Sequence, residues 1–402
     1  MSWRHRLWLV AGVVLVLLAL VAPRAAHTAS AYGPYLQDIV GTAATIRWVT
    51  AQPSRGAVEY GTSPQLGEEA REAVSTRFHM VRIHGLPPSG RCYYRVRDAG
   101  VNPHVYSFPT PVEPGEPFTF AAYGDTRTNA TVHSEVIHAI LSARPKLAIQ
   151  TGDLVADGSK WPLWEEYLTV AGPLLAEVPV YPVPGNHEGE SSYYYRLFGP
   201  GGERHAYSFD YGGCHFLGID GERSYLRSDM QWIRRDLATH RNARFTVVFL
   251  HYPPYTAQKG RIQNARYLRT QLVPVLRYFG VDLVLAGHDH NYQHYVVDGV
   301  HYVVTGGGGA PLYDVGESGV RALRRAVANE ASLMGVRTDL MALKLAKAYH
   351  YVLFTVDGHR MTARVLKPNG ELIDSFVVRG QEGGAAYAGG QRRGGAVASA
   401  GR

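Results

Sequence analysis

Side chains that bind metal ions follow five apolar segments of the chain. The segments are residues 118–123, 147–151, 178–183, 245–250 and 282–286, and the residues that follow them are Asp125, Asp153, Asn186, His251, His288 and His290. Carboxylate, amide and imidazole donors without sulfur suit Zn, Fe or Mn. The set is too large for one tetrahedral ion, and a carboxylate can bridge two. It therefore predicts a dinuclear centre, which activates water and holds both oxygens of a phosphoryl displacement.

The elements around these residues alternate between strands and helices. Helical stretches lie at 131–143, 161–175 and 229–239, between the apolar strands. This order predicts an α/β domain over 118–379, in which the carboxyl ends of the strands bring the donors together. Antiparallel hairpins are expected at 206–220, 295–305 and 351–378. Further expectations are a helical insertion at about 317–348 and a disordered Gly/Ala-rich tail at 380–402.

The N-terminal third has a different pattern. Residues 32–111 contain short strands separated by turn residues, which predicts a small β-sandwich. The segment 44–50 alternates, with Ile46 and Trp48 on the face opposite Arg47. Residues 112–117 are rich in proline and lack apolar periodicity, so we expect a linker there.

The first 31 residues resemble a secretory signal. Arg4 and Arg6 precede an apolar run at 7–22, and Ala29-Ser30-Ala31 offers a small-residue cleavage site. The run is shorter than the ~20 residues of a typical membrane span. We therefore expect secretion, with an uncleaved membrane anchor as the alternative.

Composition excludes several classes of protein. The chain has 402 residues, 46% of them hydrophobic, a net charge of +7 and only two cysteines, Cys92 and Cys214. These values exclude a disulfide scaffold, a cysteine zinc ribbon and an iron–sulfur protein, and we expect free thiols. The basic residues are scattered, so no specific nucleic-acid binding is predicted. The sequence has no P-loop and no nucleophile elbow, which leaves a serine hydrolase without support.

The ordered motifs GDT, GDL, GNHE, VFLH and GHDH are similar to those of the calcineurin-like metallophosphoesterases. The segments YGPYLQ (32–37), YGTS (60–63) and 86–94 resemble the purple acid phosphatase branch, in which a fibronectin type III-like domain comes first. The resemblance implies a four-layer αββα sandwich preceded by a small all-β sandwich. It also implies hydrolysis of phosphate mono- and diesters.

The resemblance further implies a role for each site residue. Asp125 and His290 would hold the first metal. Asn186, His251 and His288 would hold the second, and Asp153 would bridge both. His187 would contact the phosphate and protonate the leaving oxygen, whereas Glu188 would not be a main ligand.

Two positions depart from the family pattern. Ala156 stands where purple members carry a tyrosine ligand, and Arg127 stands where other members carry a histidine. The first metal is thus one protein ligand short; water, Asp157 or Tyr123 would fill the gap. We expect no tyrosinate colour. Arg127 either reaches the substrate phosphate or is a surface cation. Family histidines after the fourth motif are also missing; Lys259 or Arg261 could take their place, or no residue does.

The sequence therefore predicts a secreted phosphate monoesterase that uses two metal ions (Fe, Zn or Mn) and a metal-bound hydroxide that attacks in line. Its catalytic residues would be His187, Asp153 and Arg127, and its partner would be a phosphate ester substrate. One alternative is a phosphodiesterase or nucleotide-cleaving relative. The other is a catalytically impaired cell-surface binding module.

Overall fold

The computed structural model describes residues 31–199 and 205–380. The expected signal segment and the Gly/Ala-rich tail lie outside these residues, apart from Ala31 and Gly380 at their borders. None of the helices in the described part of the chain is long and apolar enough to cross a membrane.

The N-terminal unit is an all-β sandwich, as the sequence predicts. Its three-stranded sheet has the order β1-β2-β5, and its four-stranded sheet has the order β4-β3-β6-β7. The strand bounds are β1 (Ala31–Val40), β2 (Ala43–Ser54), β3 (Ala57–Gly61), β4 (Glu68–Arg71), β5 (Thr76–Ile83), β6 (Arg91–Arg97) and β7 (Tyr106–Pro109). Ile46 and Trp48 are fully buried between the sheets, and Arg47 is not, which confirms the predicted alternation.

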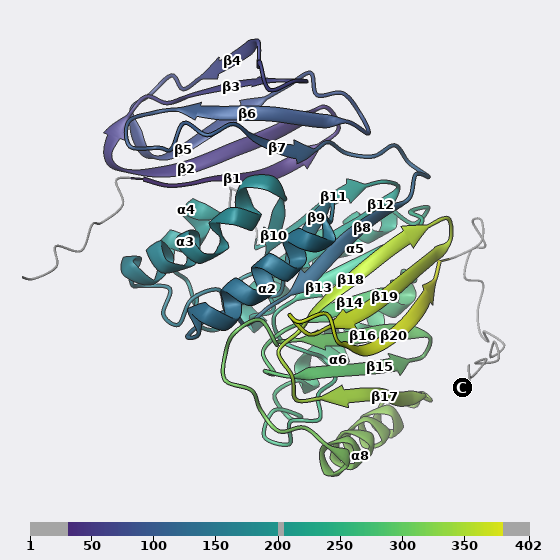
Figure 1. Ribbon diagram of the computed structural model, residues 1–402. Helices are drawn as coiled ribbons and strands as arrows, with labels where there is room; N and C mark the ends of the chain where they lie inside the picture. The colour runs from purple at the N-terminus through teal and green to yellow at the C-terminus, as the bar shows by residue number, and fades with distance from the viewer. Residues whose placement is uncertain (1–30, 200–204, 381–402) are drawn as a thin grey trace, which may run out of the picture. The chain divides into compact units, whose positions relative to one another are not determined.

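The second unit contains two larger sheets that pack face to face (Figure 1). One has the order β10-β9-β8-β18-β19-β20 and the other has the order β11-β12-β13-β14-β16-β15-β17. Their strands are β8 (Phe118–Tyr123), β9 (Leu147–Gln150), β10 (Val180–Pro182), β11 (Ala206–Tyr211), β12 (Cys214–Ile219), β13 (Thr246–Leu250), β14 (Leu283–Ala286), β15 (Tyr292–Val297), β16 (Val300–Thr305), β17 (Leu340–Ala346), β18 (Tyr351–Asp357), β19 (Arg360–Leu366) and β20 (Leu372–Arg379).

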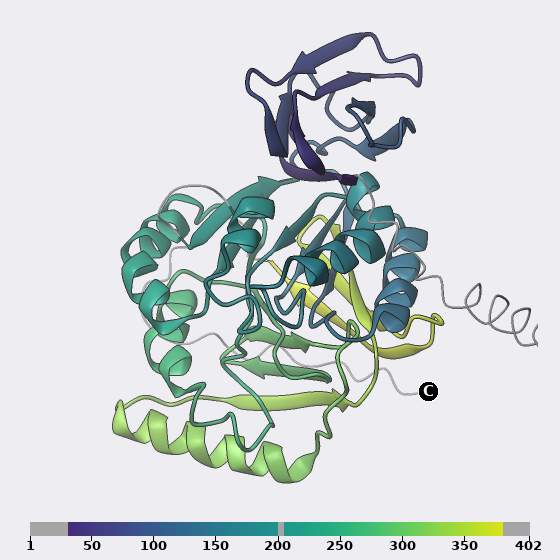
Figure 2. The same cartoon turned by 90° about the vertical axis from the view of Figure 1, so that its left-hand side faces the viewer.

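Helices cover the outer face of each sheet (Figure 2). The six-stranded sheet packs against α2 (Ala130–Ala143), α3 (Trp161–Glu177) and α4 (Ser192–Leu197). The seven-stranded sheet packs against α5 (Arg223–Thr239), α6 (Arg266–Gln271), α7 (Val273–Tyr278) and α8 (Glu317–Leu333). The resulting order of layers is αββα, which confirms the fold class implied by the family resemblance.

The core between the two sheets explains why the central strands are almost entirely apolar. The rings of Phe120 and Phe354 stack with centroids 4.6 Å apart inside the six-stranded sheet, and Phe216 of the facing sheet meets Phe120 edge-on at 5.3 Å. A strand buried on both faces has no exposed side that could carry polar residues. The polar residues are therefore displaced to the strand ends.

The helical insertion expected at 317–348 is wrong in its second half. Helix α8 ends at Leu333, and Leu340–Ala346 is strand β17, paired antiparallel with β15 at the edge of the seven-stranded sheet. The composition of this stretch suits a helix, but pairing to the open edge of β15 decides the outcome. Tertiary context overrides local propensity in this way because propensities are small.

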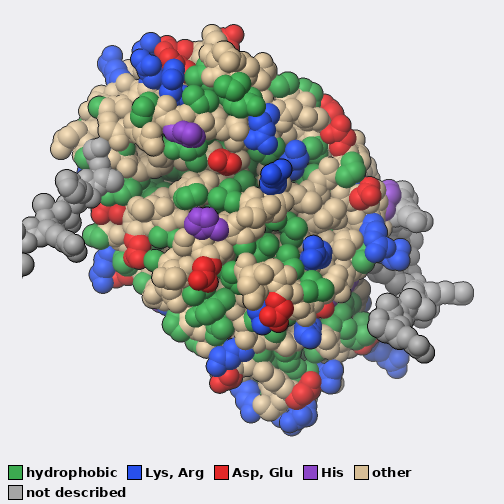
Figure 3. All heavy atoms as spheres, viewed as in Figure 1, with side chains coloured by type: hydrophobic (Ala, Val, Ile, Leu, Met, Phe, Trp, Pro, Cys, Tyr) green, Lys and Arg blue, Asp and Glu red, His purple; other side chains and the backbone are tan. Residues whose placement is uncertain are grey.

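Surface charge and cysteines also follow the sequence. On the face shown in Figure 3, basic and acidic side chains are interspersed rather than gathered by sign. Cys92 and Cys214 are buried free thiols, as expected.

Candidate metal centre

Five strand ends meet at one edge of the two sheets and carry the predicted ligands. Strands β8, β9 and β10 run parallel to one another, as do β13 and β14. Parallel strands place their carboxyl ends on the same side, so the residues after them converge. These residues are Asp125, Asp153, Asn186, His251, His288 and His290.

On one side of the centre, His251 faces three other ligand atoms. Its Nε2 lies 3.2 Å from Asn186 Oδ1, 3.2 Å from His288 Nδ1 and 3.4 Å from Asp153 Oδ1. The Nδ1 of His251 lies 2.9 Å from the Thr151 carbonyl, which can only accept, so this nitrogen carries the proton. In the neutral ring, Nε2 therefore presents a lone pair toward Asn186 Oδ1 and Asp153 Oδ1, which can only accept. A cation at their common point satisfies all of them.

The carboxylates around His251 favour positive charge at this point, whether a proton or a cation carries it. Burial lowers the pKa of His251, but the carboxylates of Asp153 and Asp125 outweigh that effect and raise it above its ordinary value. Burial lowers the pKa of His288 far below its usual range, so this ring is neutral. The centre thus favours positive charge at a point where two imidazoles and an amide meet.

On the other side, His290 faces Asp125. His290 Nε2 lies 3.4 Å from Asp125 Oδ1, while its Nδ1 donates to the Pro311 carbonyl at 2.8 Å. The carboxylate of Asp125 accepts the backbone N–H of His288 at 2.9 Å. Both side chains are almost fully buried. This side contributes one imidazole and one carboxylate, fewer donors than the His251 side.

Asp153 stands between the two sides. Three potential ligand atoms lie within 4.8 Å of one another, one each from Asp125, Asp153 and His251. Asp153 Oδ1 faces His251, and Oδ2 accepts from Arg127 Nε at 3.1 Å. Burial raises the pKa of Asp153, but His251, His187 and Arg127 outweigh it and lower the pKa below its ordinary value. Its carboxylate is thus kept ionised, as a bridging ligand must be.

Three of these residues adopt the left-handed backbone region. Asp125, Asp153 and His288 have φ angles of 56°, 54° and 70°. Such conformations are costly for residues other than glycine and concentrate at functional sites. Beside them, a Cβ on Gly185 would lie 2.2 Å from Asp153 Oδ1, so only glycine permits this approach.

Arg127 points into the centre, so the interpretation as a surface cation is wrong. Its side chain is 13% exposed, and its Nη2 lies 3.4 Å from His290 Nε2. The guanidinium therefore contacts Asp153, which stands between the two sides, and His290 on the second side.

Neither side chain considered as a replacement ligand reaches the centre. The carboxylate of Asp157 accepts from Ser159 and pairs with Lys160 at 3.0 Å on the surface. The ring of Tyr123 packs in the core beneath α2 and α3, 6.5 Å from the ring of His133.

His187 is held by the backbone of Ala156. Its Nδ1 donates to the Ala156 carbonyl at 2.7 Å, and its Nε2 lies 3.9 Å from Asp153 Oδ2. The backbone N–H of His187 also donates to Asp153 Oδ1 at 3.1 Å. The side chain is 29% exposed, so the imidazole forms part of the open face of the centre.

Glu188 has a larger role than its sequence position suggests. Its buried carboxylate accepts from the backbone N–H groups of Gly185 at 2.7 Å, Asp153 at 2.9 Å and Val155 at 3.0 Å. Burial and the nearby Asp153 raise the pKa of Glu188 to about 7. This side chain ties the loop after β10 to the loop after β9. In the sequence, only its position next to His187 indicated that Glu188 lies near the centre.

Residues 118–292 match the family described as calcineurin-like phosphoesterase. Among curated proteins, the chain is similar to purple acid phosphatase 23 of Arabidopsis thaliana, with 28% identity over 285 residues that cover 58% of this chain and 62% of the relative. Purple acid phosphatase 21 of the same plant is 29% identical over 269 residues, covering 59% of this chain and 60% of the relative. The chain thus spans about three fifths of the length of these relatives.

Solved structures show the same fold. A purple acid phosphatase from yellow lupin (Lupinus luteus) seeds superimposes with a TM-score of 0.69 and 16% identity, over 87% of this chain and 74% of that one. The structure of PhoD gives a TM-score of 0.66 with 13% identity, over 92% of this chain and 95% of that one.

Proposed function

We propose that the protein is a metal-dependent hydrolase of phosphate monoesters, because residues 118–292 match the calcineurin-like phosphoesterase family and the similar curated proteins are purple acid phosphatases. The observation that carries the proposal is the convergence of six oxygen and imidazole donors from five strand ends.

The proposed centre holds two cations. Asn186, His251 and His288 would hold one, Asp125 and His290 the other, and Asp153 would bridge them. Fe, Zn and Mn all suit these ligands. When bound, such ions lower the pKa of a water molecule toward neutrality and offset the negative charge of the phosphoryl group.

His187 supplies a proton to the leaving oxygen in this proposal. The Ala156 carbonyl fixes the Nδ1 proton, so Nε2 is the nitrogen directed toward Asp153 and the open face. A protonated Nε2 can donate to the departing alkoxide, which is the work of a general acid.

Arg127 orients the phosphate in this proposal. Its guanidinium is planar, permanently charged and able to bind two phosphate oxygens together. In the structure it contacts Asp153 and His290, so a phosphate at the centre would lie within its reach. Arg127 also places a positive charge on the His290 side, where the protein offers fewer donors. We therefore expect the two cations to bind with unequal affinity.

The test combines elemental analysis with a substrate panel. The purified protein, as isolated and after incubation with Fe, Zn or Mn, is assayed with 4-nitrophenyl phosphate and bis(4-nitrophenyl) phosphate. About two bound ions per chain and faster hydrolysis of the monoester support the proposal. Faster hydrolysis of the diester favours the phosphodiesterase alternative. Absence of both metal and hydrolysis favours the binding module.

We also propose that the protein is exported. The support is the basic, apolar and small-residue order of residues 1–31, which lie outside the described part of the chain except for Ala31. N-terminal sequencing of protein from the culture medium tests this: a chain that begins near residue 32 supports cleavage, and retention in the cytoplasm contradicts export.

A further inference from the structure

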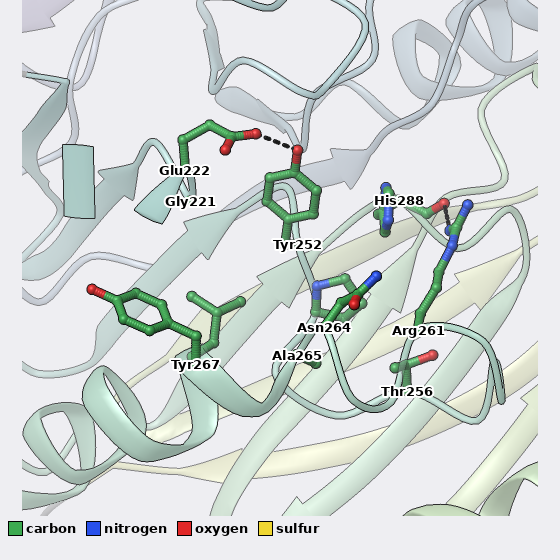
Figure 4. Close-up of a pocket in the computed structure, with 11 residues that line it drawn as sticks. Gly221, Glu222, Tyr252, Thr256, Arg261, Asn264, Ala265, Tyr267 and His288 are labelled. Atoms are coloured by element: carbon green, nitrogen blue, oxygen red, sulfur yellow. Dashed lines mark hydrogen bonds between the residues drawn. The ribbon is translucent and has the colours of Figure 1, made fainter. Parts of the chain in front are cut away.

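A cavity of about 450 Å³ lies directly beside the metal centre and has no role in the proposal above. His288 forms one end of it, and the rest comes from Gly221 and Glu222 after β12 and from the segment 252–268 after β13. Figure 4 shows the ring of Tyr252 between Glu222 and His288, with Tyr267 on another side of the cavity. A substrate held at the centre would therefore have this cavity next to it.

The walls of the cavity are mainly apolar and aromatic. Tyr252, Pro253, Tyr267 and Leu268 line it, and Pro253 and Leu268 are buried. Flat apolar walls favour an aromatic guest, because ring-on-ring contacts add to the gain from removing apolar surface from water. A small, strongly hydrated leaving group gains nothing from such walls.

Tyr252 is fixed in place as the wall nearest the metal centre. Its ring meets the ring of His288 edge-on with centroids 4.8 Å apart, and its hydroxyl donates to Glu222. A Cβ on Gly221 would lie 3.0 Å from the Tyr252 ring, so glycine lets the backbone pack against that ring. The wall is thus preformed.

The charges in the cavity disfavour an anionic guest. Arg261 is neutralised by Asp289, whose Oδ1 accepts from Arg261 Nη1 at 2.7 Å, and the same nitrogen donates to the His288 carbonyl. Glu222 is exposed and leaves a carboxylate at the rim. A leaving group with its own carboxylate or phosphate would face that charge, whereas a hydroxyl or ammonium group would be attracted by it.

We propose that this cavity binds the leaving group of an aryl phosphate monoester, and that Tyr267 and Leu268 set the preference for an aromatic ring. The inference rests on the proposed function, since it assumes that the phosphate lies at the metal centre. Tyr267 is the better position for a test, because its side chain is partly exposed whereas Leu268 is buried.

The experiment compares 2-naphthyl phosphate with glycerol 2-phosphate in the wild type and in the Tyr267→Ala and Tyr267→Phe variants. Intrinsic leaving-group reactivity cancels when each variant's ratio of kcat/KM values is divided by that of the wild type. We expect the naphthyl preference to fall about tenfold in Tyr267→Ala and to persist in Tyr267→Phe. The matched control is Tyr278→Ala, an exposed tyrosine on α7 outside the cavity.

Binding without turnover separates this inference from the proposed function. Calorimetry with 2-naphthyl phosphonate and methyl phosphonate should show tighter binding of the naphthyl compound to the wild type, lost in Tyr267→Ala. Equal affinity for both compounds, or an unchanged substrate ratio in Tyr267→Ala, overturns the inference. Failure of the metal-loaded wild type to hydrolyse either ester overturns the proposed function instead, and the phosphonate titration then decides the cavity by itself.

Discussion

In the described part of the chain, two groups of aspartate and histidine have the spacing of metal ligands, and they differ in whether protons already join their side chains. One is the metal centre around Asp153. The other, which we call the β11–α5 cluster, consists of Asp210, His215, Asp236 and His240. Both bring carboxylate and imidazole atoms within a few ångströms of one another, so proximity alone does not distinguish them.

In the β11–α5 cluster, protons already join the opposing groups. His215 Nδ1 lies 2.7 Å from Asp210 Oδ1, its partner across the β11–β12 pair, and Nε2 lies 2.8 Å from Asp236 Oδ2. Burial lowers the pKa of His215, but both carboxylates outweigh it and raise the pKa to about 9. At neutral pH the ring is therefore an imidazolium that donates from both nitrogens.

The stacking of His240 on His215 also argues against a metal ion in the β11–α5 cluster. Its ring lies parallel to that of His215, with centroids 3.8 Å apart and planes 10° apart. Imidazole binds a metal in the plane of its ring, so two stacked rings cannot both point at one ion between them. At the metal centre, by contrast, the rings of His251 and His288 are inclined at 73°. Two features therefore distinguish a candidate cation site from an ion-paired cluster. One is whether protons already join the facing nitrogen and oxygen atoms, and the other is the angle between the imidazole rings.

The largest effect is expected from the bridging carboxylate. Asp153→Asn removes the charge shared by both proposed cations, so bound metal and phosphatase activity should each fall by more than about 100-fold. Elemental analysis and 4-nitrophenyl phosphate hydrolysis measure this. Asp236→Asn, a buried aspartate of the β11–α5 cluster, is the matched control and should leave metal content unchanged. Full metal occupancy in Asp153→Asn would contradict the proposal that Asp153 bridges the two cations.

The second largest effect is expected from a comparison of two partly exposed histidines, His187 and His240. The side chains of His187 and His240 are 29% and 30% exposed, but only His187 faces the metal centre. His187→Gln should slow hydrolysis of alkyl phosphates by about 10²–10⁴-fold and affect 4-nitrophenyl phosphate less, because nitrophenolate needs no protonation to leave. His240→Gln should do neither. An equal loss for both substrates in His187→Gln contradicts the proton-donor role.

A smaller effect is expected from Arg127, which makes the two sides of the metal centre unequal. Arg127→His removes the fixed positive charge and adds an imidazole donor on the His290 side, so the more weakly held cation should bind at least about tenfold more tightly. Arg127→Ala removes only the charge and should give part of this gain. Metal titration of the apoprotein by calorimetry measures both. Weaker binding in both variants would show that Arg127 supports the cations rather than opposing them.

The smallest effect is confined to stability. The folded pKa of His215 lies above its ordinary value, so its contribution is complete below about pH 6.5 and disappears as the pH rises through about 9. The wild type should therefore lose about 1–3 kcal/mol of unfolding free energy over this range relative to His215→Gln. Urea unfolding at pH 6 and pH 10 measures the difference. A pH-independent gap between the two proteins would refute the imidazolium.

The candidate metal centre could be predicted from sequence because its residues occupy a repeated position. Asp125, Asp153 and His251 each follow a buried apolar strand within three residues, and parallel strands bring such positions together. The β11–α5 cluster could not be anticipated in the same way. Asp236 reaches His215 from a helix, and no motif marks that contact.

The amino-acid order by itself determined the strand ends and the chemical type of each donor, because burial on both faces leaves polar residues only where strands stop, whereas the αββα layering was implied by the family resemblance. Only the tertiary structure decided that Arg127 turns inward, that Ala156 offers a carbonyl to His187 and that β17 is a strand. The physical reason is that the direction of a side chain and the pairing of a sheet edge depend on residues far away in the sequence. Local periodicity carries no information about where those residues lie.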